Sequence, residues 1–196
     1  MSKEVDNKSR YVGLGAVKSA KRVQFIDGVV KVLTTPKLYK GLSPNIDEHK
    51  FIFNLKSDLE RGVEKLFAAE NPTKDSEWIQ NKADNALIWE HDTTVTLNQT
   101  RFFGTQHRPD MFIRHGNDYR IAIEYKVVSS GTPIREALGQ CLVYASEYEF
   151  SICVLFDKTK DQKIFHAYKN GMLESVLIKK LWDDFGARVV VVAPNM

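Results

Sequence analysis

The chain has 196 residues, of which 43% are hydrophobic, which suits one domain with a single substantial core. Its net charge of +3 is mild and by itself assigns no partner. No run approaches the roughly 20 apolar residues of a membrane span, and the start lacks the apolar core of a signal peptide, so we expect no membrane association. Only two cysteines occur, both within apolar segments, which is typical of reduced core residues in a cytoplasmic protein.

Residues 1–46 are expected to form a basic N-terminal arm outside the main domain. The first 40 residues hold nine Lys or Arg against three acids, a local charge of +6 that leaves −3 for the rest. Within residues 22–33, Asp27-Gly28 separates two stretches rich in β-branched residues, which predicts a β-hairpin. A basic arm on an acidic body would suit a protein that binds a phosphate backbone, although an ordinary solvated tail has the same composition.

Residues 47–196 are expected to form a single domain of mixed α/β class, with a central mixed sheet flanked by helices. Apolar residues at helical spacing predict a helix over residues 47–69. The remaining expected elements are a helix at 76–90, strands at 94–103, 109–114 and 119–128, a helix at 132–148, a buried strand at 150–156, a helix at 172–185 and a buried strand at 188–193.

Two strands at 109–128 flank Gly116-Asn117-Asp118, the composition of a tight hairpin loop. If the loop has three residues, an antiparallel ladder gives the pairs His115–Tyr119, Phe112–Ala122 and Asp110–Glu124. Side chains alternate along a strand, so Glu124 and Lys126 share one side. The hairpin therefore predicts two facing carboxylates with a lysine beside them, whereas a four-residue loop would put the acids out of opposition.

Facing carboxylates with Cβ atoms about 5 Å apart repel by roughly 3 kcal/mol at an effective dielectric constant of about 20. Protonation of one acid, solvent screening or a bound cation would relieve this repulsion, and we favour Mg²⁺ or Mn²⁺. The pattern acid-x-Lys alone carries no weight, because it recurs at residues 6–8, 48–50 and 161–163 without an apolar strand or a preceding Pro-Asp. A purely structural Pro109 at the start of a strand is the alternative.

Pro109-Asp110 and Glu124-Tyr125-Lys126, on two antiparallel strands between helices, resemble the two half-motifs of the PD-(D/E)XK nuclease superfamily. The resemblance covers roughly residues 47–157. It implies a restriction-endonuclease-like fold and the hydrolysis of phosphodiester bonds in DNA, with endonuclease action favoured.

Two further segments resemble parts of such nucleases. The segment Leu59-Glu60-Arg61 with Glu64-Lys65 is similar to the first helix of archaeal Holliday-junction resolvases, which implies that Glu60 is a third acid. Glu64 and Glu48 are alternatives for that role, and a surface salt bridge would account for any of the three. Gln140-x-x-x-Tyr144 is similar to a motif of RecB-like nucleases and implies that Gln140 positions the substrate or the lysine, although a solvated glutamine would also fit.

The expected mechanism assigns a role to each group. Asp110, Glu124 and the Tyr125 carbonyl would hold one or two Mg²⁺ or Mn²⁺ ions, with Glu60 acting through water. Lys126 would orient or deprotonate the attacking water, helped by a pKa lowered beside the metal. Cutting both strands would favour a homodimer.

Two other functions compete with this mechanism. A catalytically silent nucleic-acid-binding or assembly module would use the basic arm without metal. A magnesium-dependent enzyme acting on another phosphorylated substrate is weaker, because no Gly-rich phosphate loop occurs.

Overall fold

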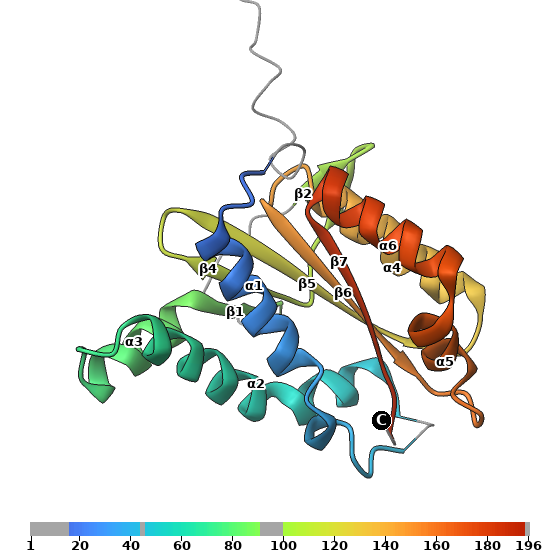
Figure 1. The fold of residues 1–196 in the computed structure, drawn as a ribbon, viewed down its shortest axis with the longest axis horizontal. Coiled ribbons are helices and arrows are strands. Elements are labelled where there is room, and N and C mark those ends of the chain that lie inside the picture. Colours follow the sequence, from blue (N-terminus) through green and yellow to red (C-terminus); the bar gives the residue numbers. More distant parts are fainter. Residues whose placement is uncertain (1–15, 44–45, 91–99, 195–196) are drawn as a thin grey trace, which may run out of the picture.

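The computed structural model describes residues 16–43, 46–90 and 100–194. A five-stranded sheet with the order β1-β4-β5-β6-β7 lies at the centre (Figure 1). In chain order the elements are α1 (Ala20–Leu33), the short 3-10 helix η2 (Pro36–Leu38), α2 (Glu48–Glu70), α3 (Ser76–Ala86), β1 (Leu87–Trp89), β2 (Thr100–Phe102), β3 (Thr105–His107), β4 (Met111–His115), β5 (Tyr119–Val128), α4 (Gly131–Tyr144), β6 (Phe150–Asp157), α5 (Lys163–Asn170), α6 (Met172–Phe185) and β7 (Ala187–Val192).

The central sheet is mixed and is covered by helices on both faces. The β1–β4 and β4–β5 pairs are antiparallel, and the β5–β6 and β6–β7 pairs are parallel. Helices α1, α2 and α3 pack on one face, while α4, α5 and α6 pack on the other (Figure 1). The expected mixed α/β class is confirmed, and the restriction-endonuclease-like assignment stays a prediction.

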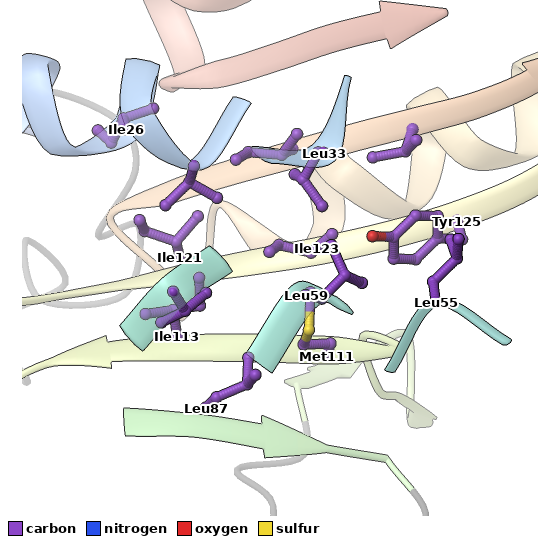
Figure 2. Packing of buried hydrophobic residues seen from close by; sticks show 14 of the residues in the cluster. Ile26, Leu33, Leu55, Leu59, Leu87, Met111, Ile113, Ile121, Ile123 and Tyr125 are labelled. Carbon is purple, nitrogen blue, oxygen red and sulfur yellow. The ribbon is translucent and has the colours of Figure 1, made fainter. Parts of the chain in front are cut away.

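The hairpin expected at residues 22–33 is wrong, because this segment is the single helix α1. Its buried side chains, Phe25, Ile26, Val29 and Leu33, recur at helical spacing and join the core formed by α2 and the sheet (Figure 2). The Asp-Gly pair lies inside the helix because Gly28 lets Leu66 of α2 approach closely: a Cβ there would lie 2.7 Å from Leu66 Cδ2. Part of the expected arm thus belongs to the main core, and residues 1–15 lie outside the described residues.

Strand β5 distributes its side chains between the two faces. Ile121, Ile123 and Tyr125 belong to the core beneath α1 and α2, as Figure 2 shows. By alternation Ala122 and Glu124 lie on the opposite face, and Ala122 packs in a small cluster with Tyr144 of α4. The acid of the second half-motif is therefore directed toward α4.

Other expected elements differ at their ends. The helix expected to reach residue 90 ends at Ala86, and the chain continues as β1, which pairs with β4. Only Thr100–Phe102 of the strand expected at 94–103 is a described strand; it pairs with β3, and residues 91–99 lie outside the described residues. Helix α5 was not expected. No helix in the described ranges has the length and hydropathy needed to cross a membrane.

Candidate active site

The hairpin β4–β5 has the expected register. Phe112 pairs with Ala122 and His115 with Tyr119, and the intervening turn has Gly116 at φ 60°. Strand β4 begins at Met111, so Asp110 lies one residue before its first paired position. The three-residue loop is thus confirmed, and Asp110 is brought to the segment of β5 that carries Glu124.

Strand β5 continues beyond its last residue paired with β4, and Asp110 and Glu48 accept hydrogen bonds from the backbone of this unpaired part. The Tyr125 N–H donates to Asp110 Oδ2 at 2.6 Å, and the Val127 N–H donates to Glu48 Oε2 at 3.3 Å. Residues 125 and 127 direct their N–H groups to the same side, which is the side of β4. The two carboxylates therefore satisfy N–H groups that a longer β4 would have bound. We call these two N–H groups and their carboxylates the β5 edge.

Glu124 is 2% exposed and lies beside Tyr144 of α4. The Tyr144 hydroxyl is 2.9 Å from Glu124 Oε2 and 2.7 Å from the Arg108 carbonyl oxygen. Burial and the charge of Glu124 raise the pKa of Tyr144, so its hydroxyl keeps its single proton. With one proton, the hydroxyl can donate a well-aligned hydrogen bond to only one of these two oxygens at a time. Tyr144 therefore links the Glu124 carboxylate to the segment that leads into β4.

The two half-motif acids have pKa values well above the usual carboxyl range. Burial is the largest cause for both. The charge of Asp110 raises the pKa of Glu124 further, and the charge of Glu48 does the same for Asp110. The Tyr125 N–H and the Tyr144 hydroxyl oppose these shifts without cancelling them. The charged forms of the two acids are therefore disfavoured, and a further positive charge nearby would stabilise them.

Lys126 lies next to both glutamates. Its Nζ is 2.8 Å from Glu48 Oε1 and 3.6 Å from Glu124 Oε1. Burial lowers the pKa of Lys126, but the hydrogen bond and charge of Glu48 outweigh this effect, so the net shift is upward. This direction holds for the site without a metal ion, and the lower pKa expected beside a bound metal stays a prediction. In this arrangement Lys126 is a fixed ammonium group held against the two acids.

The helix acid that reaches the site is Glu48, the first residue of α2, and not Glu60. Glu60 lies twelve residues further along α2, roughly 18 Å at about 1.5 Å per residue. Its carboxylate accepts from Trp89 Nε1 at 3.2 Å and is 3.9 Å from Lys56 Nζ. Among the described contacts none joins Glu60 to Asp110 or Lys126. Glu48, one of the two sequence alternatives to Glu60, occupies that position instead.

The Gln140 and Tyr144 motif is divided between two environments. Tyr144 is fully buried, and its hydroxyl donates to Glu124. Gln140 lies one turn earlier, and its side-chain oxygen is buried with no hydrogen-bond partner within the described ranges. An orphaned acceptor of this kind would accept a donor from a ligand or from water.

The donors at the site suit a hard divalent cation. Asp110 and Glu124 supply carboxylate oxygens, and the Tyr125 carbonyl lies on the same side of β5 as the N–H that Asp110 accepts. No group of three or more His, Cys, Asp or Glu able to hold a metal occurs in the part of the chain that is described. Mg²⁺ commonly binds through one or two carboxylates and completes its shell with water and substrate phosphates. Asp110, Glu124 and the Tyr125 carbonyl therefore fit such a cation.

A cleft of about 560 Å³ opens beside Asp110. It lies between the first half of α2 and the end of β1, and its lining includes Trp89, Glu90, His49, Lys50 and Lys56. A charged substrate can therefore approach Asp110 from the surface, past lysines of α2.

Comparisons with known proteins add no assignment to this geometry. No model of a protein family, no curated protein and no solved structure matches the chain significantly.

Proposed function

We propose that the protein is a metal-dependent nuclease that hydrolyses phosphodiester bonds of DNA, with internal cleavage favoured. The observation that supports this most is the pair of half-motif acids, a half-buried Asp110 and a buried Glu124, with Lys126 held 3.6 Å from Glu124. Two acids held together in poorly solvated positions beside the start of β4 destabilise each other when both are charged. Such an arrangement is typical of a site that binds a cation for function.

The residues divide the work of hydrolysis as follows. A bound Mg²⁺ or Mn²⁺ would neutralise charge on the phosphate and lower the pKa of the attacking water. Asp110, Glu124 and the Tyr125 carbonyl would hold the cation. Lys126, protonated and fixed by Glu48, would orient the water and stabilise the negative charge that develops on the phosphate. Tyr144 would orient Glu124 through its hydroxyl.

Cleavage of plasmid DNA tests this function. The wild-type protein should cut DNA with Mg²⁺ or Mn²⁺ and stop cutting when EDTA is added. Asp110→Asn and Lys126→Met should each lower the rate by at least about 100-fold, since each removes a ligand or a charge that acts in the transition state. Asp184→Asn is the matched control, because this acid pairs with Lys180 on the surface of α6, outside the cleft beside Asp110.

Two results would contradict the proposal. If Asp110→Asn and Lys126→Met cut as fast as the wild type, the site is elsewhere. If the wild type binds DNA but cuts neither duplex nor single strands with either metal, the protein is the catalytically silent binding module.

A further inference from the structure

Strands β2 and β3 form a small ribbon separate from the central sheet, and its tip is strained. Thr100 pairs with His107 and Phe102 with Thr105, leaving Phe103 and Gly104 as the two turn residues. Their φ values are 48° and 76°, the left-handed region in which residues other than glycine are uncommon. Asn or Gly would suit the first turn position better, yet the chain has phenylalanine there.

The phenyl ring at this tip contributes little to the core. Phe103 is 93% exposed, the largest exposed fraction reported among the large hydrophobic side chains of the described chain. Its one described ring contact is with Phe102, edge to face at 4.6 Å between centroids. This contact holds the ring in place while leaving most of its surface open. A strained, exposed and braced aromatic residue is costly to the fold, which favours a role in binding.

The charge around the ring indicates what it binds. Residues 100–109 contain Arg101 and Arg108 and no acid. Both arginines are exposed, and neither forms an ion pair with any residue in the described ranges. Basic residues beside an exposed aromatic ring are the combination with which proteins bind nucleic acid strands, through phosphates and through base stacking.

The ribbon is joined directly to the candidate active site. Strand β3 continues through Arg108 into Asp110, and the Arg108 carbonyl lies 2.7 Å from the Tyr144 hydroxyl. Figure 1 shows the yellow-green ribbon reaching from this region to the edge of the molecule. Phe103 and Asp110 are seven positions apart in the sequence, so their Cα atoms lie at most about 25 Å apart at roughly 3.6 Å per residue. That span corresponds to about seven nucleotides of a DNA strand.

We propose that Phe103 stacks on an unpaired or unstacked base of the DNA substrate, within about seven nucleotides of the cleaved phosphate. Arg101, next to the tip, and Arg108, at the base of the ribbon, bind phosphates of the strand between the stacked base and the cleaved bond. This inference rests on the proposed nuclease function, and it names the substrate class: DNA with a single-stranded or distorted segment near the cleavage point.

The test measures DNA binding separately from cleavage. Binding is followed by fluorescence anisotropy in the Asp110→Asn background with EDTA, using a fluorescein-labelled single strand and the corresponding intact duplex. Phe103→Gly should weaken binding to the single strand by about 10-fold, the scale of one lost stacking contact. Phe103→Trp should keep the affinity, and its indole fluorescence should be quenched by the bound strand. Leu173→Ala is the control, since Leu173 is 80% exposed on α6.

The expected change in stability has the opposite sign to the change in binding. Glycine adopts the turn conformation without strain, so Phe103→Gly should keep or raise the unfolding temperature while it weakens binding. Loss of binding in this variant therefore cannot be attributed to misfolding. If Phe103→Gly binds the single strand as tightly as its parent, or if the parent binds no single strand, the inference is wrong.

Failure of the nuclease proposal would give a different result. If the wild type cuts no DNA but Phe103→Gly still loses its affinity for the single strand, the stacking role stands and the catalytic role falls. If the wild type cuts DNA and Phe103→Gly cuts and binds equally well, the catalytic role stands and the stacking role falls.

Discussion

At the scale of single residues, the pair Glu48 and Lys126 decides how the candidate site is charged. The hydrogen bond between them is 2.8 Å long, and Glu48 also accepts the N–H of Val127. The glutamate therefore does two things: it raises the pKa of Lys126, and it joins the start of α2 to the β5 edge.

Replacing Glu48 by glutamine should lower the pKa of Lys126. Burial lowers this pKa and Glu48 raises it, so removing the negative charge leaves the effect of burial less opposed. NMR titration of the lysine side chain measures the shift, and the cleavage rate should fall as well. Glu60→Gln is the control and should leave the pKa of Lys126 unchanged. The opposite outcome, in which only Glu60→Gln has an effect, would restore Glu60 as the helix acid.

The sequence predicted the register of the hairpin correctly, and it left open which acid of the long helix lies beside the hairpin. Asp110, Glu124 and Lys126 follow from a three-residue turn and strand alternation, which depend only on near neighbours. Choosing between Glu48 and Glu60 requires knowing which end of α2 meets β5, which is a property of tertiary packing. The sequence does contain a signal that favours Glu48. Asp47 is the N-cap, so Glu48 is the first residue of the helix and lies next to a loop, from which its side chain can turn toward the sheet.

At the scale of elements, the contact between α1 and α2 depends on two glycines. Gly28 of α1 lies against Leu66, and Gly62 of α2 lies against Val32 of α1, where a Cβ would be 2.3 Å from Val32 Cγ1. The two helices thus approach closely at both positions. This contact also shows why the N-terminal hairpin prediction failed: the Asp-Gly signal is local, whereas these glycines serve helix packing.

Gly62→Ala should destabilise the protein by about 1–3 kcal/mol, because Val32 is branched at Cβ and cannot easily move aside. Gly139→Ala in α4 is the matched control. No atom lies within 4 Å of a Cβ built there, so alanine should stabilise that helix by up to about 1 kcal/mol. Urea unfolding measures both variants. Equal stabilisation by the two substitutions would contradict the close packing of α1 on α2.

At the scale of the whole molecule, the buried acids link stability to pH and to metal. The raised folded-state pKa values mean that the folded chain binds protons more tightly than the unfolded chain. Stability from these groups is therefore fully present below the ordinary carboxyl pKa of about 4, and it is lost as the pH rises through the raised values. A bound cation should restore it.

Thermal unfolding with EDTA should thus show a falling midpoint as the pH rises from acid toward weakly alkaline values. Asp110→Asn should flatten this dependence, because asparagine carries no charge and can still accept from Tyr125. Mg²⁺ at about 100 times its Kd should stabilise the wild type by about 2.7 kcal/mol and should not stabilise Asp110→Asn. At one fixed Mg²⁺ concentration the stabilisation should be larger at high pH, where the acids are charged and bind the cation more tightly. A midpoint independent of pH and of Mg²⁺ would argue against a cation site.

The β5 edge has a consequence for how the protein avoids association with itself. Beyond the first residue of β4, β5 would present free N–H groups. An open strand edge of this kind is a template for pairing with another chain. Asp110 and Glu48 occupy these groups and place negative charge along the edge. We therefore expect the proposed metal ligand Asp110, together with Glu48, also to oppose the addition of a strand from another molecule, and a variant lacking both carboxylates should associate with itself more readily.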